Sequence, residues 1–174
     1  MKIVLTDSQT VFDNKVTAEP LNEFGEVKDY GLLRYDEIAN AIAKADIVVC
    51  NKTLLNENTL KSANNLKYIG LFATGYNNID IEYCSKHGIT VCNAGSYSTN
   101  AVAQHTFALI LEHFNNTANY NQYVQDGLWK RSKTFSPFVY PLSELAGKTI
   151  GIVGFGNIGK AVAKIANAFE MNVI

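Results

Sequence analysis

Short apolar runs that alternate with segments of helical spacing constrain the fold of this chain more than any other feature. Four runs are too short to be independent helices and are interpreted as β-strands: residues 3–5, 47–50, 68–72 and 89–92. A weaker strand candidate covers residues 25–30. The four runs do not alternate polar with apolar residues, so we expect both faces of each strand to be buried.

Amphipathic segments separate these strand candidates. They cover residues 36–44, 56–63 and 79–86. In the first of them Ile38 and Ile42 fall on one face of a helix, and Gly88 follows the last one as a helix terminator. Strands without alternation, separated by helices, indicate a parallel sheet covered on both faces. Residues 1–99 are therefore expected to form a compact α/β domain of the flavodoxin-like type.

A longer helix is predicted over residues 98–116. Its surface is apolar nearly all round, so we expect it to lie between two bodies rather than on one surface. Ser98, Thr99 and Asn100 are the candidates for its N-cap. After a second short helical stretch, residues 128–143 are predicted to be an irregular segment rich in aromatic rings. Packing against a partner subunit and folding back on its own domain would each account for those rings.

Composition and charge limit the classes of function. Hydrophobic residues make up 47% and charged residues 18% of the 174 residues, a mixture that can bury a core. A formal net charge of −1 gives no support for broad electrostatic capture of nucleic acid or of an anionic membrane. The first residues lack the apolar run of a signal peptide, and no window approaches the length of a membrane span. We therefore expect a soluble, cytoplasmic protein.

The three cysteines indicate structural thiols rather than disulfides or metal ligands. Cys50, Cys84 and Cys92 form no C-x-x-C pair, and their number is odd. Cys50 and Cys92 end apolar runs, where a thiol is expected to be buried as a small hydrophobic group. Free thiols are typical of a reducing compartment, and we predict no metal site.

A glycine-rich turn joins a predicted strand over residues 148–153 to a predicted helix over residues 157–169, before a strand that begins at residues 171–174. The turn has the sequence Gly154-Phe155-Gly156-Asn157-Ile158-Gly159. Gly154 permits the tight turn, Gly156 lets the backbone approach a pyrophosphate, and Gly159 allows close packing of helix on strand. The N–H groups at the helix start, including those of Asn157 and Ile158, favour an anion. The pattern predicts a dinucleotide site; the alternative is a structural turn without a ligand.

The acidic residue that would choose between NAD and NADP has no counterpart in the sequence. It is expected about twenty residues beyond the glycines, at the end of the second strand, and the sequence stops at Ile174. A lone strand–helix unit would also leave a sheet edge and much apolar surface open. Residues 100–174 are therefore expected to comprise an interdomain helix and the incomplete start of a Rossmann domain. NAD is the expected cofactor, with NADP as the alternative.

Four ordered motifs resemble those of the D-isomer-specific 2-hydroxyacid dehydrogenase family over nearly the whole chain. The motifs cover residues 66–80, 88–94, 100–106 and 142–149, the last leading into the glycine turn. Residues 73–77, with residues 51–53 and 129–140, are most similar to the glycerate dehydrogenase (hydroxypyruvate reductase) branch. The resemblance implies hydride transfer between NAD(P)H and a small 2-oxoacid or D-2-hydroxyacid.

The resemblance also implies a substrate site in the first domain. Backbone N–H groups around Thr74, Gly75 and Tyr76 would bind the substrate carboxylate, since a turn centred on glycine can present successive amides to an anion. Lys52 would approach the substrate from a neighbouring loop. The alternative for Lys52 is an ordinary surface lysine at a strand end.

On the cofactor side, the resemblance places Thr74 and Thr106 beside the nicotinamide or its phosphates and Val102 near the ring. The alternative for Thr106 is a helix residue whose hydroxyl bonds to its own preceding turn. The five positions Gly154, Gly156, Asn157, Ile158 and Gly159 complete the predicted cofactor site.

The family's catalytic Arg, His and acid have no counterpart within residues 1–174, so we predict no catalytic residue in this chain. His87, His105 and His113 do not match the catalytic position and are expected to be structural or solvated. The full-length protein would be a homodimeric enzyme, and residues 1–174 alone would be inactive. The alternative is a non-catalytic truncated relative that serves as a dimerising or nucleotide-binding module.

Overall fold

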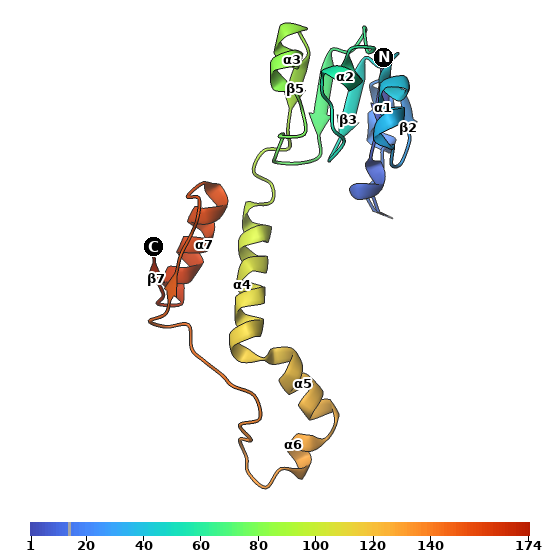
Figure 1. Cartoon of the computed structure of the whole chain (residues 1–174). Coiled ribbons are helices and arrows are strands. Elements are labelled where there is room, and N and C mark those ends of the chain that lie inside the picture. Colours follow the sequence, from blue (N-terminus) through green and yellow to red (C-terminus); the bar gives the residue numbers. More distant parts are fainter. Residues whose placement is uncertain (14) are drawn as a thin grey trace. The chain divides into compact units, whose positions relative to one another are not determined.

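The chain folds into two compact units. The structure, a computed structural model, describes residues 1–13 and 15–174. The first unit covers Met1–Gly95 and the second Ser96–Ile174 (Figure 1). Each unit has a hydrophobic core of its own. No helix in the described part of the chain is long and apolar enough to cross a membrane.

The first unit is built on a parallel sheet. Its strands are β1 (Lys2–Leu5), β2 (Glu26–Asp29), β3 (Ile47–Cys50), β4 (Tyr68–Leu71) and β5 (Thr90–Cys92). Their order in the five-stranded sheet is β2-β1-β3-β4-β5, and every neighbouring pair is parallel. This is the strand order of the flavodoxin-like fold, so the predicted fold is confirmed. The weaker strand candidate supplies the edge strand β2.

Helices cover one face of this sheet. They are α1 (Tyr35–Ile42), α2 (Glu57–Leu60) and α3 (Ile81–Lys86). The core between them and the sheet contains Val4, Ile42 and Val48, all at most 5% exposed. On the opposite face Ile3 and Leu5 pack with side chains from the 3-10 turns η1 (Ser8–Thr10) and η2 (Glu19–Glu23) and their flanks. The helix α2 is shorter than predicted, because turn hydrogen bonds follow Leu60 and lead the chain into β4.

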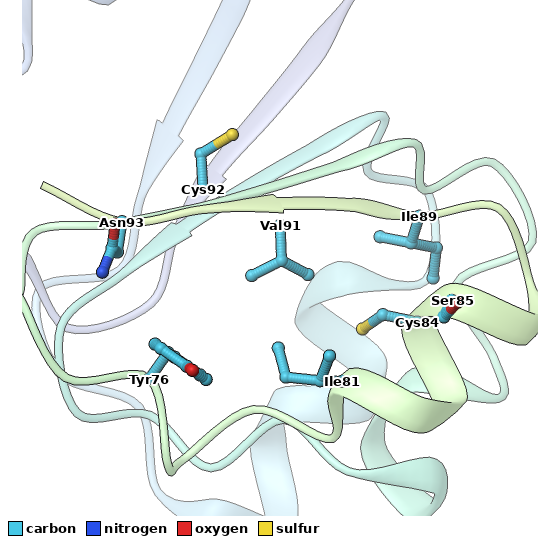
Figure 2. Close-up of a pocket in the computed structure, with 8 residues that line it drawn as sticks. All are labelled: Tyr76, Ile81, Cys84, Ser85, Ile89, Val91, Cys92 and Asn93. Atoms are coloured by element: carbon cyan, nitrogen blue, oxygen red, sulfur yellow. The ribbon is translucent and has the colours of Figure 1, made fainter. Parts of the chain in front are cut away.

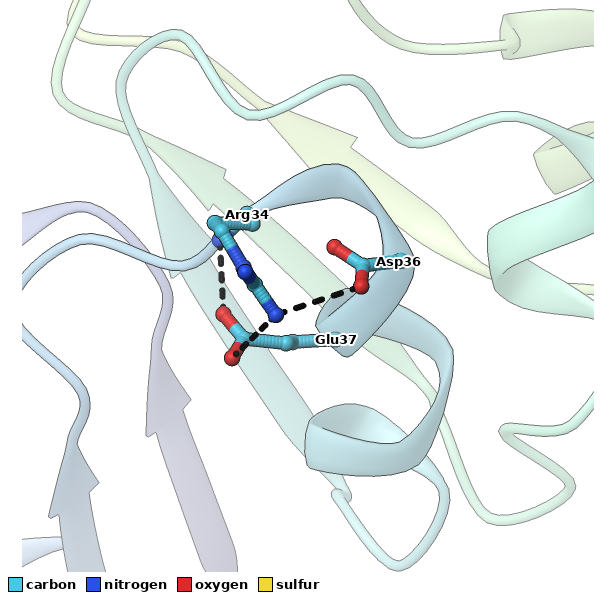
Figure 3. A network of polar contacts seen from close by, with 3 residues as sticks. All are labelled: Arg34, Asp36 and Glu37. Carbon is cyan, nitrogen blue, oxygen red and sulfur yellow. Dashed lines mark hydrogen bonds and ion pairs between the residues drawn. The ribbon is translucent and has the colours of Figure 1, made fainter.

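Charged side chains fix the start of α1. The carboxylate of Glu37 accepts the backbone N–H of Arg34 at 2.9 Å, which satisfies an amide just before the helix (Figure 3). The Arg34 guanidinium lies 3.3 Å from Asp36 and 3.4 Å from Glu37. These side chains are exposed, so each ion pair contributes about 0.5 kcal/mol or less. The cluster therefore fixes a helix end and is no candidate for a functional site.

The second unit contains four helices and a small sheet in the described residues. They are α4 (Thr99–Asn115), α5 (Thr117–Gln125), α6 (Leu128–Arg131), β6 (Thr149–Ile150), α7 (Asn157–Ala168) and β7 (Asn172–Val173). β6 pairs with β7 in parallel, as the predicted strand–helix–strand unit requires. β6 is shorter than the predicted residues 148–153, because only Thr149 and Ile150 have partners in β7.

The long helix α4 packs on α7. Ala103 and Phe107 are the buried residues of α4, and the Phe107 ring stacks on Phe169 with centroids 5.5 Å apart. Ser98 is the N-cap, as one of the three candidates predicted, but its side chain makes no capping hydrogen bond. Leu109 on α4 is 60% exposed, so one side of the helix provides the packing within this unit.

The aromatic segment folds back on its own unit near its C-terminal end, where Tyr140, Pro141 and Ser143 bond to Tyr120, Asn116 and Phe114. It begins with the short helix α6 rather than with irregular chain. The Tyr120 hydroxyl donates to the Tyr140 carbonyl at 2.8 Å and accepts the Tyr140 N–H at 3.2 Å. Phe135 and Phe138, in contrast, are 86% and 90% exposed. Folding back thus accounts for Tyr140, while the two phenylalanines stay uncovered.

Candidate functional site

The carboxyl ends of the strands in the first unit lie at one edge of the parallel sheet, and a buried carboxylate organises that edge. Asp7 follows β1 and is 2% exposed. Its carboxylate accepts the backbone N–H groups of Asn51, Lys52 and Thr53 at 2.8, 2.5 and 2.8 Å. A buried charge is tolerated when hydrogen bonds satisfy it, and here three successive amides do so. Asp7 was not among the predicted site residues, although an acidic residue just beyond the end of a buried strand is the signal that points to it.

The turn that Asp7 holds carries Lys52. Because the backbone of Lys52 is the bonded part, its side chain stays exposed. No ion pair in the described part of the chain includes Lys52. The next residue, Thr53, accepts the side-chain amide of Asn78 on its carbonyl at 2.8 Å. The Lys52 turn is thereby joined to the loop that follows β4.

The loop after β4 presents its backbone to solvent. Thr74, Gly75 and Tyr76 are exposed. None of the N–H groups of residues 74–77 donates to an acceptor within residues 1–13 and 15–174. A Cβ at Gly75 would meet only the Asn77 side chain, at an ordinary 3.5 Å, so packing does not require glycine there. Open amides beside a glycine are what close approach of an anion needs.

Hydrogen bonds tie this loop to the segment that follows β5. The Asn93 side-chain amide donates to the Thr74 carbonyl at 2.7 Å, and its carbonyl oxygen accepts the Gly95 N–H at 3.3 Å. The Thr74 hydroxyl donates to the Gly95 carbonyl at 2.6 Å. The Ala94 N–H donates to the Ala73 carbonyl at 3.0 Å. The predicted substrate loop is thus held from one side by the end of β5.

A pocket of about 600 Å³ lies behind this loop, between α3 and β5. Its lining residues are Tyr76, Ile81, Cys84, Ser85, Ile89, Val91, Cys92 and Asn93. Figure 2 shows Val91 and Ile81 facing one another, with Tyr76 at one end. The Cys92 side chain lies on the opposite side of β5 from Val91. The lining contains no His, Asp, Glu, Lys or Arg side chain, so we assign the pocket no chemistry.

The cysteines differ from the prediction at one position. Cys50 and Cys84 are buried, but Cys92 is exposed. The expectation for Cys92 was wrong because β5 is a three-residue edge strand, which leaves that side chain uncovered. Burial raises the pKa of the Cys50 thiol to about 12, with a smaller contribution from the Asp7 charge. Burial also raises the pKa of Cys84. Neither buried thiol has the lowered pKa of a nucleophile.

The glycine turn in the second unit has the geometry of a phosphate cradle. Gly154 has a φ of +97°, a conformation that favours glycine. A Cβ at Gly159 would lie 2.2 Å from the Gly154 carbonyl oxygen, so helix and turn touch there, whereas nothing lies within 4 Å of a Cβ at Gly156. The N–H groups of residues 153–159 donate to no acceptor in the described chain. These features fit a dinucleotide pyrophosphate. Gly159 allows the helix to touch the turn, Gly156 leaves space for the ligand, and the amides at the helix start can donate to it.

Four more of the predicted cofactor residues lie in the second unit, whereas Thr74 lies in the first. Asn157 opens α7 and its side-chain amide donates to the Ser96 hydroxyl at 2.9 Å. Ile158 and Val102 are 37% and 39% exposed. The Thr106 hydroxyl donates to the Val102 carbonyl one turn earlier, at 2.8 Å. This is the bond to its own preceding turn that the alternative interpretation of Thr106 describes. Because the hydroxyl hydrogen is used in it, the Thr106 hydroxyl oxygen can only accept a further hydrogen bond.

The histidines make local contacts. The His87 ring stacks on Tyr83 at 3.9 Å, and its Nδ1 lies 2.8 Å from the Tyr83 carbonyl. His113 packs edge-on against Phe114 at 5.1 Å. All three histidines, including His105, are exposed. Across residues 1–13 and 15–174, no three His, Cys, Asp or Glu side chains are grouped to hold a metal ion.

Comparison with known proteins gives a family match over almost the whole chain. Residues 3–172 match the protein-family model described as "D-isomer specific 2-hydroxyacid dehydrogenase, catalytic domain". A hydroxypyruvate reductase of Blautia hydrogenotrophica is 36% identical over 177 residues, covering 100% of this chain and 55% of the relative. A glycerate dehydrogenase of Methylorubrum extorquens is 34% identical, covering 99% of this chain and 54% of the relative. The chain thus spans about half the length of the curated relatives it matches.

Solved structures of similar fold contain either of two nicotinamide cofactors. An acyclic imino acid reductase in complex with NADPH and D-Arg has a TM-score of 0.78 and 32% identity, over 98% of this chain and 54% of that one. A D-lactate dehydrogenase from Aquifex aeolicus, complexed with NAD and lactic acid, has a TM-score of 0.75 and 28% identity, over 99% of this chain and 50% of that one. Fold, motif order and family model agree: the chain belongs to the D-isomer-specific 2-hydroxyacid dehydrogenase family.

Proposed function

We propose that this chain provides the substrate-carboxylate site and the pyrophosphate turn of an NAD(P)-dependent D-2-hydroxyacid dehydrogenase. The observation that carries the proposal is the row of amides over residues 74–77 that find no acceptor among the described residues, next to an edge where Asp7 fixes the Lys52 turn. A small anion with an adjacent carbonyl fits such a loop, because the loop offers backbone N–H donors beside a glycine that lets the ligand approach closely. The similarity to hydroxypyruvate reductase and glycerate dehydrogenase favours hydroxypyruvate and D-glycerate as the reactant pair.

In this proposal the residues of the first unit bind and orient the substrate. The amides of Thr74, Gly75 and Tyr76 hold the carboxylate. The Lys52 ammonium, free of ion pairs with the described residues, adds positive charge on the substrate side. A bound carboxylate restricts the positions that the 2-carbonyl can take. The nicotinamide, when bound, supplies or accepts the hydride.

The second unit would hold the cofactor through the glycine turn. Gly154, Gly156 and Gly159 give the backbone its path, and the amides of Asn157 and Ile158 face the pyrophosphate. Thr106 and Val102 of this unit would lie toward the nicotinamide. We propose NAD as the cofactor, with NADP as the alternative, since similar structures contain one or the other.

We further propose that the groups exchanging the proton with the substrate oxygen lie outside residues 1–174. The three histidines are occupied with local contacts or lie on the helix α4, and neither buried thiol is activated. Residues 1–174 alone are therefore expected to turn over no hydroxypyruvate with NADH, whereas the full-length protein does.

The uncovered aromatic residues support a homodimer. Phe135 and Phe138 are 86% and 90% exposed on one segment of the second unit, and exposed apolar patches mark interaction sites. The paired variant Phe135→Asp and Phe138→Asp is expected to convert a dimer into a monomer in light scattering; an unchanged mass would contradict this assignment.

The three free thiols fit a reducing compartment, and we propose the cytoplasm.

The experiment that tests the function uses the full-length protein with hydroxypyruvate and either NADH or NADPH. Loss of cofactor absorbance is followed, and the configuration of the glycerate formed is determined by chiral chromatography. We expect D-glycerate, with one cofactor preferred. Absence of turnover with every small 2-oxoacid would overturn the proposal and favour the non-catalytic binding module, and L-glycerate would contradict the assigned stereochemistry.

A further inference from the structure

Two backbone carbonyls of the substrate loop are held by the segment after β5. The Ala73 carbonyl accepts the Ala94 N–H at 3.0 Å. The Thr74 carbonyl accepts the Asn93 side-chain amide at 2.7 Å. Both bonds come from the same side, since residues 93 and 94 follow one strand end.

Holding these carbonyls decides where two amides point. In a trans peptide the C=O and the next N–H lie in one plane and point in opposite directions. The bond to Ala73 therefore turns the Thr74 N–H away from β5, and the bond to Thr74 turns the Gly75 N–H away from β5. These are two of the amides that find no acceptor in the described chain.

The peptide between Thr74 and Gly75 needs such an anchor more than its neighbours do. Glycine accepts positive and negative φ at similar cost, so a peptide that precedes it can rotate with little steric penalty. Rotation would place the Thr74 carbonyl oxygen, a partial negative charge, where the loop otherwise offers an N–H. An anion would then meet repulsion instead of a hydrogen bond.

We propose that Asn93 is a positioning residue, which orients the Gly75 N–H toward the substrate carboxylate by holding the Thr74 carbonyl. The inference rests on the proposed function of this loop. Only an amide side chain serves here, because Asn93 donates to Thr74 and accepts from Gly95 at once. An aspartate of the same size could still accept the Gly95 N–H. Its second oxygen would face the Thr74 carbonyl oxygen, and two acceptors cannot form a hydrogen bond.

The test compares Asn93→Asp and Asn93→Ala with the wild type in the full-length protein. The KM for hydroxypyruvate is expected to rise by about tenfold or more, the size of one lost hydrogen bond to a charged group. The kcat and the KM for the cofactor stay close to wild type, because the carboxylate is held equally in the ground and transition states. Asn172→Ala is the matched control. It removes an exposed amide-to-carbonyl bond, to Gly147 at 3.0 Å, in the other unit, and is expected to leave all three constants unchanged.

Circular dichroism and thermal unfolding establish that the variants are folded, which the exposed position of Asn93 favours. A second readout is hydrogen exchange at the Gly75 amide: oxamate, an unreactive 2-oxoacid analogue, is expected to protect it in the wild type and not in Asn93→Asp. An unchanged oxoacid KM in a folded Asn93→Asp, with an active wild type, would overturn this inference alone. A wild type without turnover would overturn the proposed function and this inference with it.

Discussion

The carboxylate of Asp7 accepts the backbone N–H of Lys52 at 2.5 Å, across 45 positions of sequence. The bond fixes the main chain of Lys52 and leaves its side chain free at the carboxyl edge of the sheet. With the bonds to Asn51 and Thr53, a single buried side chain that follows β1 sets the path of the turn after β3. A residue outside the proposed substrate loop thus shapes the proposed site through the backbone.

Asp7→Ala is expected to destabilise the protein by about 3 kcal/mol. It leaves three amides without their acceptor, and the Thr53 amide is buried. Denaturant unfolding measures the loss as a lower midpoint at unchanged slope. Asp36→Ala, which removes an exposed carboxylate at the start of α1, is the control and is expected to change stability by about 0.5 kcal/mol or less. Equal midpoints for Asp7→Ala and the wild type would refute the structural role of Asp7.

Lys52→Met tests whether the free ammonium binds substrate. Because only the backbone of Lys52 is anchored, the variant is expected to keep wild-type stability. Loss of the charge should raise the KM for hydroxypyruvate about tenfold in the full-length protein. The control is Lys67→Met, an exposed lysine just before β4, at the opposite end of that strand. Equal KM values for the two variants would identify Lys52 as an ordinary surface lysine.

The glycine turn permits two alanine substitutions with opposite outcomes. Gly159→Ala places a Cβ 2.2 Å from the Gly154 carbonyl oxygen, which neither backbone can avoid. We expect a loss of stability of about 1–3 kcal/mol. Gly156→Ala meets no atom within 4 Å and should fold normally, but its methyl group would occupy the approach of the pyrophosphate. Calorimetric titration with NADH should therefore show weaker binding for Gly156→Ala, and unimpaired binding would argue against the assigned cradle.

Much of this fold could be predicted because its signals are local. The apolar runs without polar alternation identified the parallel strands, and the spacing of Gly154, Gly156 and Gly159 identified the strand-to-helix turn. The role of Asp7 could not be predicted, since its partners lie 44 to 46 positions away. The exposure of Cys92 depended on β5 being an edge strand, which the sequence pattern of that strand does not reveal.

Alkaline pH is expected to destabilise the fold through Cys50. Burial raises the pKa of this thiol from 9.0 to about 12 in the folded protein. Below pH 9 both states keep the proton, so the contribution to stability is fully present. Above pH 9 the unfolded thiol ionises first, and the free energy of unfolding falls as the pH rises toward 12, by up to about 1.4 kcal/mol per pH unit.

The Cys50→Ala variant isolates that effect. The cavity lowers its stability at every pH, but its decline between pH 9 and 11 should be shallower than that of the wild type. Equal slopes would show that Cys50 does not contribute to the loss of stability at alkaline pH.

In the native protein at neutral pH, a thiol reagent should label Cys92 rapidly and spare the buried Cys50 and Cys84.

The most direct test of the substrate site is the exchange of the backbone amides that have no acceptor in the described chain. Hydrogen exchange of residues 74–77 is measured in the full-length protein with cofactor, in the presence and absence of oxamate. The site predicts that oxamate slows exchange at Thr74, Gly75 and Tyr76 and leaves exposed amides elsewhere in the first unit unchanged. Inhibition by oxamate without any protection of these three amides would contradict the site.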